Sequence, residues 1–215
     1  MLITDGIHQI DDVKGAHSYL VTGTNPFLVD TGLPHQEERI LAYMQKVGIK
    51  PSQLIGIVLT HADVDHVGSV AALARVTQAP VYAHPAEIPF ILQSTARLGI
   101  KRWLPLLISP LYGRLRPPQS VTNVDSAMFG QWELMATPGH TPGHLALYRN
   151  GIAIVGDLLI GGNLRPAPWF FTWDKKQLQS SIEQLISRPL RWILPGHGQA
   201  TPAASHWLDG LTKFR

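Results

Sequence analysis

Residues 60–66 read Thr60-His61-Ala62-Asp63-Val64-Asp65-His66 and follow the apolar run Ile55–Leu59 directly. A continuous apolar run of this length is typical of a strand that is buried on both faces. The segment after it offers two imidazoles and two carboxylates, which are side chains that bind divalent transition metals. In an extended segment His61, Asp63 and Asp65 share one face, and a bend at Asp65 would bring His66 around to them. The pattern predicts a metal site at the end of a buried strand.

Each of these residues also has a simpler interpretation when it is taken alone. Asp65 could cap a helix that begins there, and Asp63 could be a solvated loop residue. The grouping of all four behind one strand favours the metal site over these separate roles.

Three later segments place His or Asp just after an expected strand. They are Thr137-Pro138-Gly139-His140-Thr141-Pro142-Gly143-His144, then Gly156-Asp157, and then Pro195-Gly196-His197-Gly198. Glycine beside a ligand lets the backbone turn tightly and approach a metal. Proline stiffens the same loops and so reduces the entropy that is lost when the ligands are fixed. These segments are therefore predicted to contribute further ligands.

Taken together, the four segments resemble the pattern of the metallo-β-lactamase superfamily, which is His-x-His-x-Asp-His followed by Gly-His, Gly-Asp and Gly-His. They occur in this order over almost the whole chain, and Asp30-Thr31-Gly32 matches the turn usual after an early strand. The resemblance, which is to the glyoxalase II-like or lactonase-like branch, implies an α+β fold of the four-layer αββα sandwich type. We expect a single domain over residues 1–215.

The resemblance also implies a role for each matching residue. One metal ion would be held by His61, Asp63 and His140, and a second by Asp65, His66 and His197. Asp157 would bridge the two ions, and Asp65 would also be catalytic, because it could take up a proton and pass it to the leaving group. His144 would be a structural hydrogen-bonding residue.

Asp63 departs from the pattern, because most members of the superfamily carry His at this position. With Asp63, the charges of two divalent ions, three carboxylates and one hydroxide sum to zero, whereas the common pattern leaves one positive charge. An oxygen-rich, more anionic site suits manganese or iron better than an imidazole-rich site does. The expected cofactors are therefore two divalent metal ions, either zinc or the manganese or iron that Asp63 favours.

These ligands predict a hydrolase that cleaves an ester, thioester, lactone, amide or related carbonyl bond with a metal-bridging hydroxide. One alternative is an iron-dependent dioxygenase or another redox member of the superfamily. A second alternative is a binding protein with a degraded metal site. A Ser-His-Asp hydrolase is disfavoured, because the chain contains no Gly-x-Ser-x-Gly turn.

Composition narrows the choice of partners. The net charge is +3, and the Lys and Arg residues are scattered rather than gathered in the stripe usual for nucleic-acid binding. The chain has no Cys and therefore no thiolate ligands. No secretory leader and no apolar run of about 20 residues is recognisable. We expect a cytoplasmic protein that acts on a small molecule and has neither nucleic acid nor membrane as a partner.

Residues 95–120 crowd large apolar side chains among four prolines, Pro105, Pro110, Pro117 and Pro118. Proline excludes one long regular helix here, so we expect an insertion that is either a lid over the site or the interface of a homodimer. Tyr112 in this insertion is a candidate substrate contact. Trp169, Phe170 and Phe171 are the others, since they lie on a loop rich in Gly and Pro after Asp157. His17 and His84, near strand ends, are weaker candidates for the pocket.

Helical periodicity and capping signals predict four helices, of which the one from Asp174 has the most complete signals. They start near His35, near Asp65 or His66, at Asp174, and at Pro202, and they end near Val47, Ala74, Ser187 and Leu211. A further helix is expected to open at His84-Pro85. Short strands are predicted at residues 7–10, 18–21, 26–29, 55–59, 81–83, 132–136, 144–148, 152–155 and 191–194.

Overall fold

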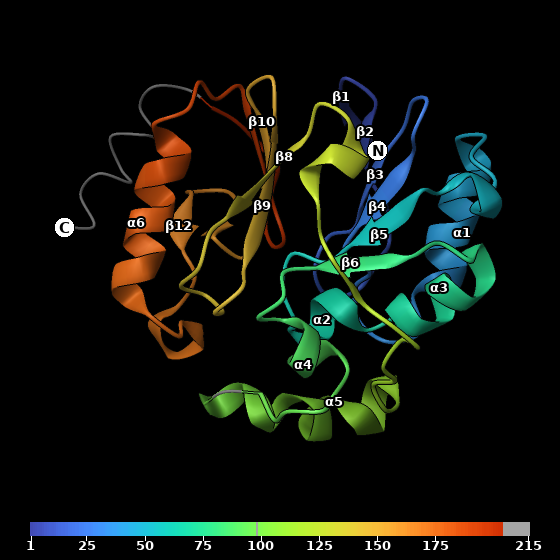
Figure 1. Cartoon of the computed structure of the whole chain (residues 1–215), viewed down its shortest axis with the longest axis horizontal. Coiled ribbons are helices and arrows are strands. Elements are labelled where there is room, and N and C mark those ends of the chain that lie inside the picture. Colours follow the sequence, from blue (N-terminus) through green and yellow to red (C-terminus); the bar gives the residue numbers. More distant parts are fainter. Residues whose placement is uncertain (98, 204–215) are drawn as a thin grey trace. The chain divides into compact units, whose positions relative to one another are not determined.

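The computed structural model describes residues 1–97 and 99–203 (Figure 1). The chain divides into two compact units, residues 1–124 and residues 125–215. Each unit is built on its own sheet and is described by itself. The single domain expected over 1–215 stays a prediction.

The first unit contains a sheet of seven strands that follow one another in sequence order. The first four strands form an antiparallel meander, and the fourth to the seventh run parallel. Strands β1 to β7 span Leu2–Thr4, Ile7–Gln9, Tyr19–Val21, Phe27–Val29, Gly56–Val58, Val81–Ala83 and Thr122–Asn123.

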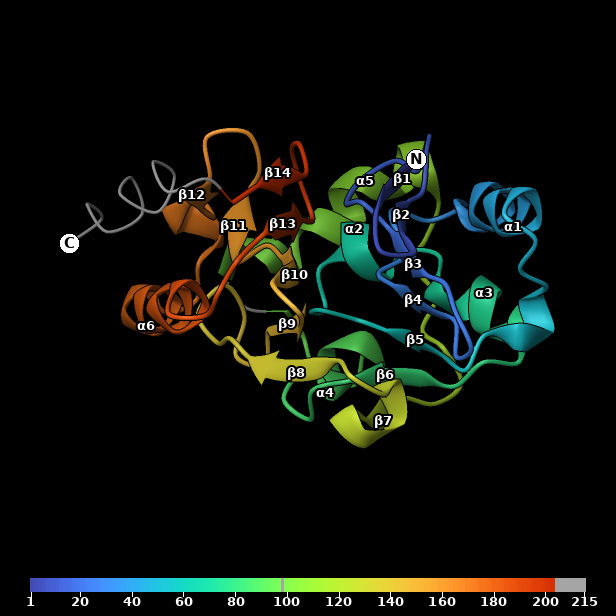
Figure 2. The same cartoon turned by 90° about the horizontal axis from the view of Figure 1, so that it is seen from above.

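Parallel strands need crossover connections, and helices supply most of them here. Helices α1 and α3 lie side by side (Figures 1 and 2). They join one core with the sheet, in which Leu28, Ile40 and Ile57 are completely buried. Burying each such side chain stabilises the fold by about 1.5–3 kcal/mol. The helices are α1 Glu37–Lys46, α2 Val64–Val67, α3 Val70–Thr77, α4 Ile88–Ile91 and α5 Leu104–Tyr112, with 3₁₀ turns η1 Pro51–Gln53 and η2 Gly99–Arg102.

The helix predicted from Asp65 to Ala74 is in fact two helices, α2 and α3, which are separated by Gly68 and Ser69. The Ser69 hydroxyl donates to the Leu33 carbonyl. A Cβ at Gly68 would lie 2.2 Å from the carbonyl carbon of Leu33, so the turn after β4 occupies this space. Helical periodicity in the sequence does not reveal this tertiary contact. The prediction of one continuous helix was therefore wrong.

The insertion predicted at 95–120 contains two short helical segments, η2 and α5. Pro105 lies in the first turn of α5, where its missing N–H is not needed, and Pro110 lies inside the helix. No single long helix forms, as the prolines predicted. The outer surface of α5 is apolar, since Leu107 is 69% exposed and Leu111 is 80% exposed.

The second unit contains a five-stranded sheet in the order β14-β13-β10-β9-β8. Strands β10 and β13 are parallel, and the other pairs are antiparallel. The sheet strands are β8 Glu133–Ala136, β9 Leu145–Arg149, β10 Ile152–Gly156, β13 Trp192–Pro195 and β14 Thr201–Pro202. A separate hairpin consists of β11 Leu159–Ile160 and β12 Arg165–Pro166, and there are two 3₁₀ turns, η3 Ser126–Phe129 and η4 Trp169–Phe171.

Helix α6 (Lys175–Ile186) packs its apolar face against this sheet, and Ile182 and Leu185 contribute to the shared core (Figure 1). Its predicted start is confirmed, because Asp174 Oδ1 accepts hydrogen bonds from the backbone N–H groups of Lys176 and Gln177 at 2.8 and 3.0 Å. The terminal helix predicted from Pro202 is contradicted at its first residue, which lies in β14. The rest of that prediction falls outside the described residues, apart from Ala203.

Candidate metal centre

Each of three neighbouring parallel strands in the first unit is followed, within four residues, by a buried polar side chain. Asp30 follows β4, His61 lies three residues beyond the end of β5, and Glu87 lies four residues beyond β6. All three side chains are buried. The carboxyl ends of parallel strands meet at one edge of a sheet, which is where α/β proteins place their ligands. The topology therefore gathers these side chains from segments far apart in the sequence.

Two imidazoles at this edge are held by hydrogen bonds to their Nδ1 atoms. His66 Nδ1 lies 2.8 Å from Asp30 Oδ2 and donates to it, because a carboxylate can only accept. Thr60 Oγ1 donates to the same carboxylate at 2.7 Å, so it accepts from His61 Nδ1 at 3.0 Å. With Nδ1 protonated in both rings, Nε2 carries the lone pair. This is the form in which histidine binds a metal while its other nitrogen contacts a carboxylate or hydroxyl group.

Asp63 is buried and forms an ion pair that the sequence did not predict. Its Oδ2 lies 2.6 Å from Lys101 Nζ and 3.5 Å from His61 Nε2, and both partners of the ion pair have side chains only 9% exposed. The interpretation of Asp63 as a solvated loop residue is therefore wrong. Lys101 also changes the charge balance of the site, because its ammonium offsets the extra negative charge that Asp63 brings.

Asp65 and His66 lie in the short helix α2. Asp65 is half-buried, and one of its carboxylate oxygens lies within 4.8 Å of a ring nitrogen of His66. The residue before α2 is Asp63, so Asp65 is inside the helix and is not its N-cap. The simpler capping role proposed for Asp65 is therefore excluded, and its carboxylate stays a candidate ligand.

The backbone of Ala62, between two candidate ligands, is fixed from both sides. Its N–H donates to the buried Glu87 carboxylate at 2.8 Å, and its carbonyl accepts from Arg97 Nε at 2.9 Å. Burial lowers the pKa of Arg97, while the negative charges of Asp63, Glu87 and Asp65 oppose that shift. These contacts hold the ligand segment in place without using any ligand atom.

The second unit groups one carboxylate and two imidazoles at the edge where β8, β10 and β13 end. Asp157 Oδ2 lies 3.6 Å from His140 Nε2, and its Oδ1 lies 3.6 Å from His197 Nε2. Each oxygen of one carboxylate thus faces a different imidazole. This arrangement suits a carboxylate that serves two ions, which is the role the resemblance implies for Asp157.

His144 is a positioning residue for Asp157. The Asp157 backbone N–H donates to His144 Nε2 at 3.1 Å, and His144 Nδ1 lies 2.8 Å from the Thr137 hydroxyl. Since both ring nitrogens are used within the protein and the ring is fully buried, the predicted structural role is confirmed.

Gly139 provides the expected turn, with a φ of 138°, and also serves a second purpose. A Cβ at Gly139 would lie 2.2 Å from the backbone nitrogen of Leu178, in the first turns of α6. The Gly139 carbonyl also accepts from the N–H groups of Trp173 and Asp174. In this unit the glycine therefore lets the loop that carries His140 pack directly against α6.

The candidate substrate contacts lie in both units. Tyr112 is half-buried at the end of α5 in the first unit. In the second unit, Trp169 and Phe170 in η4 are 70% and 50% exposed, and Phe171 is half-buried. Their roles stay predictions. His84 Nδ1 accepts from the backbone of Ala86, and His17 lies 3.0 Å from Gln9 Nε2, so both rings have structural contacts.

The donor set of each unit fits divalent metal ions. The first unit offers His61, Asp63, Asp65 and His66, and the second offers His140, Asp157 and His197. Imidazole nitrogens and carboxylate oxygens suit zinc, manganese and iron. Sequence reasoning missed Lys101, Glu87 and Arg97, whereas the Asp-Thr-Gly turn was a signal for Asp30.

The sequence model of the metallo-beta-lactamase superfamily matches residues 11–197, so the chain belongs to this superfamily. It has the α+β fold of that superfamily. The chain is 30% identical to the probable metallo-hydrolase YflN of Bacillus subtilis, and the match covers 86% of this chain and 84% of the relative. It is also 30% identical to a hydroxyacylglutathione hydrolase of Dechloromonas aromatica, of which it covers only 57%.

Solved structures give the same fold. The structure of TTHA1623 in a di-iron-bound form is 30% identical, has a TM-score of 0.70, and is matched over 91% of this chain and 93% of that one. The metallo-beta-lactamase family protein TTHA1429 from Thermus thermophilus is 21% identical, with a TM-score of 0.73 over 97% of this chain and 78% of its own. The second likeness shows the fold alone.

Proposed function

We propose that this protein is a metal-dependent hydrolase that cleaves an ester, thioester, lactone or related carbonyl bond of a small molecule. The observation that carries the proposal is the pair of imidazoles, His61 and His66, whose Nδ1 atoms are held by Thr60 and Asp30, so that Nε2 is the ring nitrogen that would bind a metal. The names of the two relatives, a probable metallo-hydrolase and a hydroxyacylglutathione hydrolase, support the same reaction class.

Two divalent ions are the proposed cofactors. In this proposal His61, Asp63 and His140 would hold one ion, Asp65, His66 and His197 would hold the other, and Asp157 would contribute an oxygen to each. When bound, such ions supply a water with a pKa near neutrality and a positive charge that polarises a carbonyl oxygen.

The protein's own residues carry the remaining steps. The Asp65 carboxylate takes up a proton from the attacking water and passes it to the leaving group. Asp30 keeps His66 in one tautomer and one orientation through its 2.8 Å contact. His144 holds the backbone of Asp157 in place through its 3.1 Å contact. Trp169, Phe170, Phe171 and Tyr112 are the proposed substrate contacts.

We infer the preferred metal from the type of donor atom that Asp63 supplies. The carboxylate of Asp63 is an oxygen donor that favours manganese or iron. Lys101 cancels its charge at 2.6 Å, so the preference rests on donor type and not on net charge. Iron gains support from TTHA1623, whose structure is in a di-iron-bound form. Zinc remains the alternative.

The proposed partner is a small-molecule substrate, and neither nucleic acid nor a membrane is proposed as a partner. Helix α5 is proposed to form either a lid over the site or the interface of a homodimer. Among residues 1–97 and 99–203, the helices are too short or too polar to cross a bilayer.

The test combines metal analysis with a substrate panel. The protein, purified without chelators, should contain up to two equivalents of metal and hydrolyse one of an ester, a thioester, a lactone or a β-lactam. Asp157→Ala should lose metal and turnover, while Glu183→Gln, an exposed change on α6, should lose neither. Oxygen uptake on the same substrates without hydrolysis would instead indicate the dioxygenase or redox alternative. Metal-free protein with no turnover after reconstitution would indicate a binding protein.

A further inference from the structure

One segment of the first unit carries basic residues and no acidic ones. Between Glu87 and Asp125 the sequence contains no acidic residue, although the whole chain has 15. The same segment contains five of the 18 basic residues, namely Arg97, Lys101, Arg102, Arg114 and Arg116. Lys101 is paired with Asp63, and Arg97 interacts electrostatically with Asp63, Glu87 and Asp65, so Arg102, Arg114 and Arg116 are the remaining positive charges of this segment.

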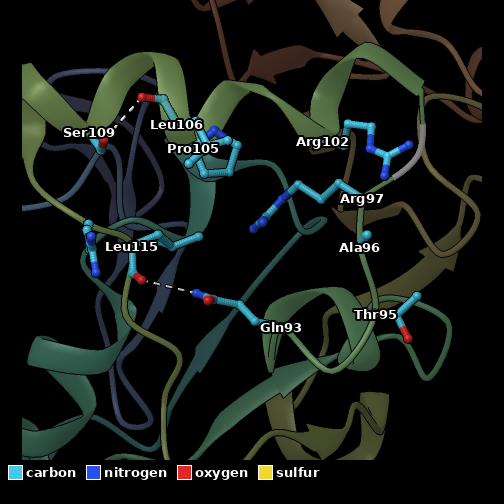
Figure 3. Close-up of a pocket in the computed structure, with 10 residues that line it drawn as sticks. Gln93, Thr95, Ala96, Arg97, Arg102, Pro105, Leu106, Ser109 and Leu115 are labelled. Carbon is cyan, nitrogen blue, oxygen red and sulfur yellow. Dashed lines mark hydrogen bonds between the residues drawn. The ribbon is translucent and has the colours of Figure 1, made fainter.

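Part of this segment surrounds a cavity of about 520 Å³ (Figure 3). Three of its ten lining residues are arginines, Arg97, Arg102 and Arg114, and none is acidic. Pro105 and Leu106 add apolar surface to the wall. The lining thus combines cations that recognise anions with a short apolar surface.

Arg97 connects the cavity to the candidate ligands. Figure 3 shows its side chain reaching into the space between the labelled residues. Its Nε donates to the carbonyl of Ala62, the residue between His61 and Asp63. Its Nη2 is buried and has no hydrogen-bond partner among the described residues. A buried donor without an acceptor is costly, so this atom favours a ligand that brings an acceptor.

Arg102 and Arg114 are exposed, and neither forms an ion pair within residues 1–97 and 99–203. The Arg102 guanidinium lies 5.4 Å from the centre of the Trp103 ring, which limits its range of positions. Guanidinium groups recognise carboxylates and phosphates through paired hydrogen bonds. Exposed cations on the rim of a cavity also raise the local concentration of anions.

We propose that this cavity binds an anionic group of the substrate, a carboxylate or a phosphate, beside the bond that is cleaved. The assignment to the substrate rests on the proposed function, whereas the binding of an anion does not. Arg97, Arg102 and Arg114 bind the anionic oxygens, and Pro105 and Leu106 contact the carbon chain that links them to the reacting carbonyl.

Binding is tested on the metal-free full-length protein, so that coordination to a metal does not contribute. Hexanoate, hexyl phosphate and the neutral hexanamide are titrated by calorimetry, because they share a carbon chain and differ in charge and in anionic group. At least one anion should bind about tenfold or more tightly than hexanamide, and the tighter anion identifies the group. Equal affinity for hexanamide would overturn the proposal.

The arginines are tested by the double change Arg102→Gln and Arg114→Gln. Both side chains are exposed, so the fold should survive, which circular dichroism checks. The matched control is Arg75→Gln with Arg116→Gln, which removes the same charge from exposed positions outside the cavity. The cavity variant should weaken anion binding about tenfold, and the control should stay within about twofold. Equal effects of the two would show only a general charge effect and refute the site.

Kinetics separate this proposal from the proposed function. On the metal-loaded protein, the cavity variant should raise KM for an ester that carries a carboxylate or phosphate and leave kcat and the neutral ester unchanged. Anion binding without any hydrolysis would refute the hydrolase and keep the anion site. Hydrolysis with equal KM values for charged and neutral esters in both proteins would keep the hydrolase and refute the link to the substrate.

Discussion

The Nζ of Lys101 lies 2.6 Å from the Oδ2 of Asp63, and both side chains are 9% exposed. The pair joins η2, in the insertion, to the segment that carries His61 and His66. The same Oδ2 atom of Asp63 thus lies 2.6 Å from an ammonium nitrogen and 3.5 Å from the imidazole Nε2 of His61.

The first prediction concerns the stability of this pair in metal-free protein. Lys101→Met should lower the free energy of unfolding by about 3–5 kcal/mol, because it leaves a buried carboxylate without its cation. Asp63→Asn should also destabilise the protein, and the double variant should lose less than the sum of the two losses. Chemical denaturation of the four proteins in the presence of a chelator gives the coupling energy. Strict additivity would mean that the pair contributes nothing.

The second prediction concerns metal preference. Asp63→His replaces an oxygen donor by an imidazole, so it should increase the ratio of zinc to manganese. Asp63→Ala should empty one of the two proposed sites preferentially and spare the ion proposed to bind to Asp65, His66 and His197. Elemental analysis of the three proteins, each reconstituted with equal zinc and manganese, measures both effects. The same stoichiometry and ratio in all three would remove Asp63 from the ligands.

A third prediction concerns Asp30, which contacts His66 but is not a proposed ligand. Asp30→Asn keeps an acceptor for His66 Nδ1 and removes the negative charge. Metal affinity should fall about 10–100-fold, as is usual when the carboxylate behind a histidine ligand is lost. Titration against a chelating dye measures it, with Glu183→Gln as the control. An unchanged dissociation constant would show that Asp30 only supports the fold through Thr60.

The fourth prediction separates a lid from an interface. Leu107→Ser with Leu111→Ser changes two exposed side chains, so stability should change by no more than about 0.5 kcal/mol per site. If α5 contacts the substrate, KM should increase for esters with long acyl chains and stay constant for an acetate ester. Mass measurement by light scattering should show no change. A halved mass with equal effects on all esters would identify a dimer interface.

The fifth prediction concerns the start of α6. Backbone hydrogen bonds, from Gln177 first, lower the pKa of Asp174, so its ionised form stabilises the folded state. This contribution is complete above the ordinary carboxyl pKa of about 4 and is lost as the pH falls through the lower pKa of the folded protein. Asp174→Ala should lower Tm at pH 7 and remove this part of the acid sensitivity, whereas Asp174→Asn should keep most of the cap. Melting curves at several pH values measure both. Parallel curves for wild type and Asp174→Ala would contradict the role.

Sequence reasoning located the strand before His61, the start of α6 at Asp174 and the structural role of His144. It succeeded there because the signals are local, namely an apolar run, a capping residue and a Gly-His motif. It missed Lys101, which lies 38 positions from Asp63 in a segment where nothing local in the sequence pairs that lysine with a carboxylate. It also joined α2 to α3, since the contact of Gly68 with Leu33 depends on tertiary packing. The grouping of ligands within one unit follows from strand order, which the sequence alone does not give.

The ties between the insertion and the ligand segment bear on how new variants of this enzyme can be built. Arg97 bonds to the carbonyl of Ala62 and Lys101 pairs with Asp63, so the insertion is not an interchangeable module. A chimera that takes this loop from a relative without a cation at position 101 would leave the carboxylate of Asp63 buried without its ion-pair partner. Substrate range and metal chemistry would then change together, and a designer who wants to alter only one should exchange positions 63 and 101 as a unit.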